Sequence, residues 1–379
     1  MTVPEAPRRP LRVLHAPVNV GNQPWTLSRA ERRIGLESDL VTNYQTWLGY
    51  PADRVLSSVG DYSLSGLARR TAVGLAAPFR YDVLHYYFGR SLLYWDDIPR
   101  FNKMPFTDLR LARRLGRRIF MTLQGCDARL AGDSNRRNAY TPCGTGRCSA
   151  YAACISTYDA QRRTMIDGIL PLCDRAFYLN PELGHYAPTA TFLPYANVDI
   201  DAVTPREART NARPIIVHAP SDAKIKGTDC ILAALDAIRK EHDFELVLVQ
   251  GKTHDEAMRI YRQADLVVDQ VLAGWYGGFA VEVMAMGKPV ACYIRDEDLH
   301  FIPPQMWAEM PILRLDPSNL VADFKAIFAQ RDAWRAIGMK SRRYVERWHH
   351  PDAIARALRR LYLDPSAVLS IEETSSCAA

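Results

Sequence analysis

The chain repeats one pattern along its length: a short apolar run, a polar loop and then an amphipathic helical segment. Residues 11–18, LRVLHAPV, form the first apolar run. The pattern restarts at residues 215–220, IIVHAP, after the polar stretch DAVTPREARTNARP near residues 200–213, which has the composition of a linker. Apolar runs that alternate with helices predict parallel sheets with helices on both faces. We therefore expect an α/β protein of two Rossmann-like, doubly wound units that face a cleft.

The other apolar runs extend this prediction along the chain. Helices are expected between them, and the last helical segment, 348–363, is long enough to pack back across both halves. The expected division is an N-terminal unit at 1–199, a C-terminal unit at 200–345, and a crossing helix with a frayed tail at 346–379. The expected strands are 37–45, 81–89, 117–125, 175–180 and 191–199 in the first half, and 244–251, 264–270, 289–294 and 311–315 in the second.

Charge and composition narrow the classes of partner. The 48 basic and 42 acidic residues give a net charge of only +6. Without a nucleic-acid-binding motif, this bias permits anionic ligands but predicts no nucleic-acid partner. No apolar run is long enough to span a bilayer, and residues 1–18 hold no separate apolar signal segment, so we expect a cytoplasmic protein. The arginines within residues 109–118 either form a solvated helix face, which we favour, or a peripheral contact with an anionic membrane.

Five of the eight cysteines lie within residues 126–173, which we interpret as an insertion in the first unit. Their spacing lacks paired Cys-x-x-Cys knuckles, so we favour reduced thiols over a structural zinc site and expect no metal. The three most closely spaced thiols, the alternative zinc ligands, are Cys143, Cys148 and Cys154.

Residues 274–290, GWYGGFAVEVMAMGKPV, give the strongest indication of a ligand site. A glycine-rich turn leads into a helix start, where unpaired amides and the helix dipole favour an anion. Gly277 and Gly278 would bring amides to phosphates, although an ordinary tight turn fits the same residues. Glu282 lies among apolar neighbours and suits the hydroxyls of a ligand along the helix. Phosphate plus polyol predicts a nucleotide or a nucleotide sugar.

Further candidates follow the expected strands, at the edge where ligands of such sheets bind. Asp127 follows the run 117–125 and either orients or deprotonates an acceptor hydroxyl, or caps a helix. His218 ends a strand and faces the cleft, whereas His15 and His85 are expected to be satisfied core histidines. The loop after the first strand, with Gly21, Asn22 and Gln23, would contact either the phosphates of the nucleotide ligand, as the donor of a transferred group, or a second substrate that accepts this group.

Five segments together give the chain a family resemblance over most of its length. They are HAPVNVGNQP, LQGCDAR, LPYANVD, HAPSDAKIKGTD and the segment 274–290. At these segments the chain resembles the retaining GT-B glycosyltransferases of family four. The resemblance implies a C-terminal unit that binds a UDP-, GDP- or TDP-linked sugar. It also implies an N-terminal unit that binds a small-molecule, glycan or lipid-linked acceptor, and transfer with retention and without a metal or cofactor.

The resemblance also implies roles for individual residues. Lys226 would stabilise the charge that develops on the leaving diphosphate. Glu282 would contact the ribose, and Phe279 would accompany the two glycines of the phosphate turn. Two positions depart from the family pattern. An acid that contacts the donor sugar is replaced by Gly274, and an arginine near the Lys-Gly loop is replaced by Ser221, with Lys224 as the nearest spare cation.

We therefore expect a nucleotide-sugar-dependent glycosyltransferase. One alternative is a nucleotide-sugar epimerase, since some epimerases share this two-domain fold. A second alternative is a binding protein that has lost catalysis. Gly274 supports the second alternative, and the presence of both Lys226 and Glu282 speaks against it.

Overall fold

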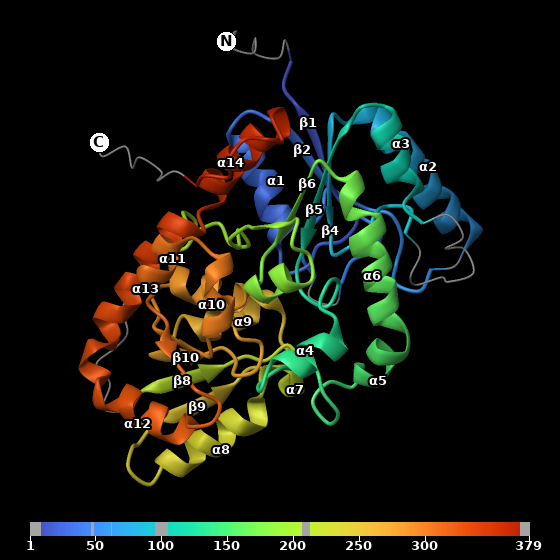
Figure 1. The fold of residues 1–379 in the computed structure, drawn as a ribbon. Helices are drawn as coiled ribbons and strands as arrows, with labels where there is room; N and C mark the ends of the chain where they lie inside the picture. Colours follow the sequence, from blue (N-terminus) through green and yellow to red (C-terminus); the bar gives the residue numbers. More distant parts are fainter. Residues whose placement is uncertain (1–8, 47–48, 62, 95–104, 207–212, 372–379) are drawn as a thin grey trace, which may run out of the picture.

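The computed structural model describes residues 9–46, 49–61, 63–94, 105–206 and 213–371, and they form two parallel sheets (Figure 1). The first sheet has the order β3-β2-β1-β4-β5-β6-β7, and the second has the order β12-β11-β10-β8-β9. The strands of the two sheets confirm the predicted α/β class. They are β1 (Arg12–Ala16), β2 (Glu37–Thr42), β3 (Arg54–Val55), β4 (Val83–Tyr87), β5 (Arg118–Leu123), β6 (Arg175–Tyr178), β7 (Thr191–Phe192), β8 (Ile215–His218), β9 (Glu245–Leu248), β10 (Leu266–Val268), β11 (Val290–Cys292) and β12 (Leu313–Arg314).

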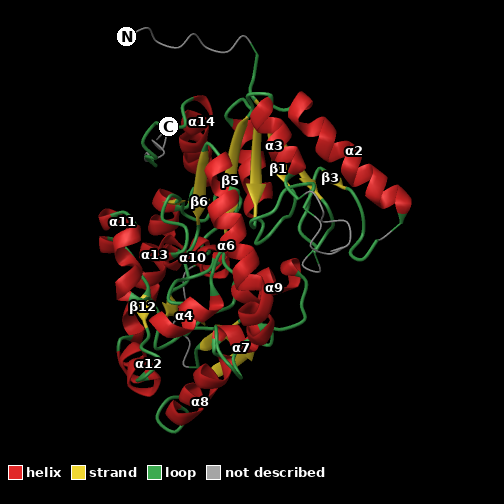
Figure 2. Ribbon diagram, turned by 45° about the vertical axis from the view of Figure 1, so that its right-hand side comes forward, coloured by secondary structure: helices red, strands yellow, loops and turns green. Residues whose placement is uncertain are grey.

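Helices cover both sheets (Figure 2). The first half carries α1 (Gln23–Arg33), α2 (Leu64–Arg80), α3 (Thr107–Arg114), α4 (Ala131–Arg137), α5 (Tyr151–Ala153) and α6 (Asp159–Gly168). The second half carries α7 (Ala223–Lys226), α8 (Thr228–Ile238), α9 (His254–Tyr261), α10 (Gly278–Ala285), α11 (Pro304–Ala308), α12 (Leu320–Ala329), α13 (Trp334–Trp348) and α14 (Pro351–Leu363).

The registers bring the carboxyl ends of neighbouring strands together. In the first sheet Ala16 of β1 pairs with Tyr86 of β4, and Tyr87 pairs with Thr122 of β5. In the second sheet Val268 of β10 lies between His218 and Ala291. The loops that leave these ends therefore form one edge of each sheet, where ligands of such sheets bind.

Helix α14 crosses back to the first sheet, as predicted, and lies beside α1 (Figure 1). It buries Ile354, Leu358 and Leu361 in one apolar cluster with residues of β1, β4 and β5. Its Tyr362 hydroxyl donates to Glu31 Oε1 at 2.9 Å and lies 2.8 Å from His85 Nδ1. The core of the first half thus includes a helix from the far end of the chain.

Several expectations about elements need correction. Helix α2 was not predicted, because its exposed Leu64, Leu75 and Phe79 and its internal Pro78 obscure the apolar stripe of a packed helix. Helices α12, α13 and α14 follow Asp316, and the boundary at 346, which stays a prediction, lies within the residues of α13.

The expected linker and tail are partly packed. Arg342 of α13 donates to the carbonyl oxygens of Ile200 and Val203, so the start of the linker lies against the second half. Residues 207–212 lie outside the described part. Arg175 donates to the carbonyls of Pro365 and Ala367, so residues 365–371 are held rather than frayed. Residues 372–379 lie outside the described part as well.

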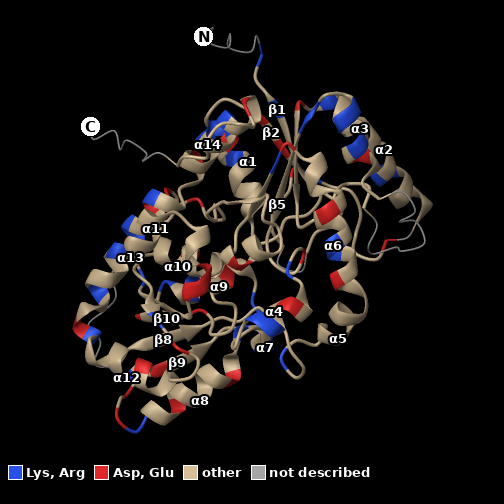
Figure 3. Cartoon of the chain, in the orientation of Figure 1, with Lys and Arg blue, Asp and Glu red and all other residues tan. Residues whose placement is uncertain are grey.

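Lys and Arg residues lie on α3 and along α13 (Figure 3). On α3, Arg110, Arg113 and Arg114 are exposed while Leu109 is buried, as expected of a solvated helix face. Within the described ranges, no helix has the length and apolar character needed to cross a bilayer.

Candidate functional site

Lys226 lies at the carboxyl edge of the second sheet, beside the segment that follows β10. Its Nζ is 2.7 Å from Asp269 Oδ1, and Asp269 Oδ2 accepts the amide of Gly277 at 2.8 Å. Asp269 is fully buried, whereas the Lys226 side chain is 18% exposed. The carboxylate therefore fixes an ammonium that still reaches open space and has further N–H donors for an anion. Asp269 Oδ2 also occupies the Gly277 amide, which was expected to face a phosphate.

The crossover residue Asn197 links this edge to the first half. Its Nδ2 donates to the Gly278 carbonyl at 3.1 Å, and its own carbonyl accepts from Asn22 Nδ2 at 3.3 Å. Gln23 Oε1 accepts the amide of residue 196 at 2.6 Å. A methyl group on Gly278 would lie 2.9 Å from Asn197 Nδ2, so any side chain at this position would displace the Asn197 amide. The structure thus brings predicted residues from opposite halves together.

The turn that presents Asn22 needs an uncommon backbone. Both Gly21 and Asn22 have φ of +60°, in the left-handed region that glycine and asparagine tolerate best. This turn places Asn22 as the residue before α1 and aims its side chain across the junction.

Several buried side-chain atoms at this junction have no hydrogen-bond partner within the described ranges. They are Asn22 Oδ1, Gln23 Nε2, Gln124 Oε1, Asn197 Oδ1 and Trp275 Nε1. Gln124 belongs to the same group because its Nε2 donates to the Val20 carbonyl. Buried polar atoms are normally paired, so this concentration marks a place where a polar ligand would supply the partners. Asn197 and Trp275 lie in two of the segments that carry the family resemblance, but neither was selected as a site residue.

Glu282 lies on α10 with 5% of its surface exposed. Its Oε1 is 3.0 Å from His254 Nε2 at the start of α9. The hydrogen bond to Glu282 raises the pKa of His254. The ring of Tyr50, from the first half, meets His254 edge-on at 5.5 Å. The predicted ribose contact therefore has a histidine partner that sequence reasoning missed, since 28 residues separate the pair.

The missing acid at Gly274 has a steric explanation. Gly274 has φ of +73°, and a methyl group there would lie 2.7 Å from the guanidinium carbon of Arg295. Arg295 is 3% exposed, pairs with Asp298 at 2.9 Å and donates to the Tyr140 carbonyl at 2.8 Å. A buried guanidinium therefore fills the space next to Gly274, and it bridges the second half to the first.

The other predicted residues of the second half are His218, Ser221, Lys224 and Phe279. His218 does not face the cleft as expected: it is fully buried, with Nδ1 2.9 Å from the Val268 carbonyl and Nε2 2.9 Å from Thr228 Oγ1. Burial lowers its pKa and so favours the neutral ring, in which Nδ1 donates to the Val268 carbonyl and Nε2 accepts from the Thr228 hydroxyl. Ser221 and Lys224 are exposed, and Phe279 is half-buried with its ring 4.9 Å from that of Tyr261.

Asp127 lies at the carboxyl end of β5, on the first half's side of the junction. Its carboxylate accepts the amides of Gln124 at 3.0 Å and Gly125 at 2.6 Å, which shapes its own loop. Burial raises its pKa. Asp127 also lines a cavity of about 640 Å³ together with Arg90 and Arg162, two residues that the sequence analysis did not select.

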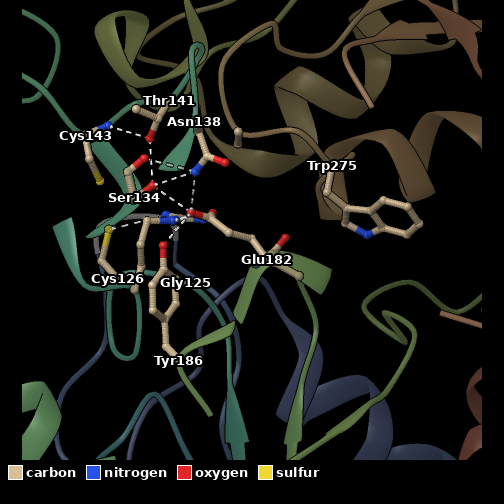
Figure 4. A network of polar contacts seen from close by, with 12 residues as sticks. Gly125, Cys126, Ser134, Asn138, Thr141, Cys143, Glu182, Tyr186 and Trp275 are labelled. Carbon is tan, nitrogen blue, oxygen red and sulfur yellow. Dashed lines mark hydrogen bonds and ion pairs between the residues drawn. The ribbon is translucent and has the colours of Figure 1, made fainter. Parts of the chain in front are cut away.

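The cysteine-rich insertion is held by a buried ion pair rather than by thiols (Figure 4). Arg129 Nε is 2.7 Å from Glu182 Oε2, and Ser134 Oγ, which also contacts Thr141, donates to Glu182 Oε1 at 2.6 Å. Burial opposes the ionised form of Glu182, but Arg129 lowers its pKa overall.

The described cysteines are free thiols. Cys143 and Cys154 pack with Ala131, and burial raises the pKa of Cys143 to about 11. Within the described ranges, no group of three or more His, Cys, Asp or Glu residues is placed to hold a metal ion.

Comparisons with known proteins give the fold. No protein-family model matches the chain, and no curated protein matches its sequence. Sucrose-phosphate synthase from Thermosynechococcus elongatus is similar in structure, with a TM-score of 0.58 and 15% identity over 94% of this chain and 99% of that one. A Listeria monocytogenes protein assigned as a UDP-N-acetylglucosamine 2-epimerase has a TM-score of 0.53 and 12% identity, covering 96% of this chain and 98% of its own.

A third similar structure is that of Anabaena HepE in complex with UDP-glucose. Its TM-score is 0.52 at 9% identity, over 92% of this chain and 98% of that one. The likenesses span nearly the whole chain and confirm the GT-B fold: two Rossmann-like units with a C-terminal helix that crosses back.

Proposed function

We propose that the chain is a glycosyltransferase that moves a sugar from a nucleotide-diphosphate donor to an acceptor hydroxyl. The observation that carries the proposal is the fixed ammonium of Lys226 at the edge of the second sheet, opposite unpartnered polar atoms of the first half. When the glycosidic bond breaks, negative charge develops on the diphosphate, and an ammonium already held by Asp269 stabilises it with little reorganisation.

The other residues have roles that follow from their positions. The amides at the start of α10 suit the phosphates, because the first N–H groups of a helix have no partner within it. Glu282 suits the ribose hydroxyls, which would replace His254 at one of its oxygens. HepE was solved with UDP-glucose, so UDP is the first nucleotide to test. By family resemblance we propose retention, with front-face attack assisted by the leaving phosphate and without a metal.

The test is turnover by a Lys226→Ala variant. Loss of the leaving-group cation should reduce turnover by at least about a hundredfold. Lys240→Ala, which removes an exposed lysine beyond the end of α8, is the matched control and should leave turnover unchanged. Near-normal turnover in Lys226→Ala would remove the proposed role. Separately, Glu282→Ala should weaken UDP binding in calorimetry, and unchanged affinity would argue against a ribose contact.

A nucleotide-sugar epimerase is the second candidate, favoured by the structural likeness to the Listeria monocytogenes protein. The two activities separate in a reaction without acceptor. An epimerase interconverts the donor sugar, whereas the proposed glycosyltransferase leaves the donor intact or hydrolyses it slowly.

A further inference from the structure

The junction between the two halves contains side-chain amides whose orientation is fixed by backbone groups. Asn22 Nδ2 donates to the Asn197 carbonyl at 3.3 Å, and Asn197 Nδ2 donates to the Gly278 carbonyl at 3.1 Å. Gln124 Nε2 donates to the Val20 carbonyl at 3.2 Å. A backbone carbonyl can only accept, so each of these contacts identifies the nitrogen of the amide and leaves the oxygen as the remaining atom.

Gln23 is fixed with the opposite polarity. Its Oε1 accepts the amide of Ala196 at 2.6 Å, and because an amide N–H can only donate, Nε2 is the remaining atom. Within the described part of the chain, the oxygens of Asn22, Gln124 and Asn197 and the nitrogen of Gln23 have no partner. Gln23 is fully buried and Asn197 is 2% exposed, whereas Asn22 and Gln124 are half-buried. The junction therefore offers a ligand three acceptors and one donor, all of them uncharged.

These amides lie next to the cation that would meet a leaving diphosphate. Asn197 contacts the carbonyl of Gly278. The preceding residue, Gly277, donates its amide to Asp269, and Asp269 also holds Lys226 Nζ at 2.7 Å. In a nucleotide sugar the sugar is attached directly to the diphosphate. A diphosphate bound at Lys226 therefore places its sugar beside the unpartnered amide atoms.

We propose that this junction selects a donor sugar that is rich in hydroxyls and carries no acidic group. A hydroxyl can donate to the carbonyl oxygens of Asn22, Gln124 and Asn197 and can accept from Gln23 Nε2. A carboxylate or a phosphate can only accept, so it forms no hydrogen bond with the three oxygens and loses hydration without return. The identification of the ligand as a donor sugar rests on the proposed function, whereas the exclusion of an acidic group rests on the polarity of the junction.

The test compares two donors that differ only at C6 of the sugar. Calorimetry on the full chain measures UDP-glucose, which has a hydroxyl on C6, UDP-glucuronate, in which C6 is a carboxylate, and UDP itself. We expect UDP-glucuronate to bind at least about tenfold more weakly than UDP-glucose, because its carboxylate leaves buried acceptors unpaired. Equal affinity for the two donors would overturn the proposal, as would failure of UDP-glucose to bind at millimolar concentration.

Variants locate the sugar contact. Asn22→Gly removes one unpartnered oxygen at a backbone φ of +60°, which glycine adopts without strain. Gln124→Met removes another at nearly the same side-chain length. Each variant should weaken UDP-glucose about fivefold, the contribution of one hydrogen bond, and should leave the affinity for UDP unchanged. Gln330→Ala, an exposed position just beyond α12, is the matched control and should bind both ligands like the wild type.

Two results with these variants would refute the sugar contact. One is an equal loss of affinity for UDP and UDP-glucose, which would give the amides a structural role. The other is unchanged affinity for UDP-glucose in both variants. The comparison of the two donors uses the unmodified chain, so it decides the proposal even if a variant does not fold.

Transfer assays separate this proposal from the proposed function. If UDP-glucose is preferred through Asn22 and Gln124 but no acceptor hydroxyl receives the sugar, the proposed function fails while the selection for a neutral sugar stands. If glucuronate is transferred as efficiently as glucose, the selection fails while the proposed function stands.

Discussion

The two sheets differ in how their helix-covered faces are built. Between the first sheet and helices α1 and α14, the apolar cluster surrounds a polar network of Glu31, His15, His85 and Tyr362. Between the second sheet and helices α8 and α12, the cluster is formed by aliphatic and aromatic side chains such as Ile231 and Phe324. The first core therefore depends on a polar network that reaches a distant helix, whereas the second combines apolar packing of nearby elements with the buried contact of His218 to Thr228.

The difference has a physical consequence. Removing methyl groups from an apolar core lowers the free energy of unfolding in small steps. Removing the partner of a buried polar group costs the full desolvation penalty of the group that remains. We therefore expect substitutions of similar size to destabilise the first core more than the second. Three substitutions test this comparison, and a fourth variant tests an ion pair outside the two cores.

The largest effect is expected from Glu31→Ala. Glu31 is fully buried and accepts from His15 at 2.8 Å, Ser38 at 2.7 Å and Tyr362 at 2.9 Å. Its removal leaves three buried groups without this partner and should lower the free energy of unfolding by about 3–5 kcal/mol. Urea denaturation measures the change, with Asp236→Ala, an exposed acid on α8, as the control. A loss similar to the control would contradict the importance of the network.

Tyr362→Phe tests the hydroxyl that joins α14 to this network through hydrogen bonds with Glu31 and His85. The ring still packs, but Glu31 and His85 lose the hydroxyl between them. We expect a loss of about 1–3 kcal/mol in the free energy of unfolding. If the phenylalanine variant is as stable as the wild type, the helix is held by its apolar face alone.

Ile231→Val probes the second core with a small apolar change. Ile231 of α8 is fully buried among aliphatic and aromatic neighbours. Removing one methylene should cost about 0.5–1.5 kcal/mol. The same urea titration applies, and a loss as large as that of Glu31→Ala would erase the contrast between the two cores.

The smallest effect concerns the ion pair at the cleft rather than either core. The hydrogen bond to Glu282 raises the pKa of His254 above its ordinary value of 6.5. The pair therefore stabilises the fold fully below pH 6.5, and its contribution is lost as pH rises through the raised pKa. Because His254 is partly exposed, the contribution should be below about 1 kcal/mol. The Tm difference between wild type and His254→Gln should shrink with rising pH; a constant difference would mean that the pair does not titrate.

The donor side of the junction was the more predictable side. Gly277, Gly278 and Glu282 lie within nine residues of sequence, and Lys226 precedes a turn glycine in a strand-to-helix loop. Residues this close in sequence can be recognised as one pattern without a structure. The cavity that Asp127 lines is assembled from the ends of β4 and β5 and from α6, so its lining residues carried no joint signal in the sequence.

The remaining errors have specific physical reasons. His218 was placed in the cleft because it ends a strand, but a run of four residues in a buried parallel strand gives no alternation from which to choose a face. Gly274 could be identified as a departure from the family pattern, yet only the structure shows Arg295 beside it. The domain boundaries remain predictions, although the crossing helix was correctly placed at the end of the chain.

The return of α14 to the first sheet also affects how the protein is made. A ribosome synthesises β1, β4 and β5 long before it reaches residue 351, where α14 begins. Until then Val13, Leu27 and Phe120 lack the α14 side chains that cover them in the folded protein. During that interval the nascent first half exposes part of its future core. The first half therefore completes its folding only after the whole second half has been synthesised. The two halves depend on each other during synthesis, although each has its own sheet.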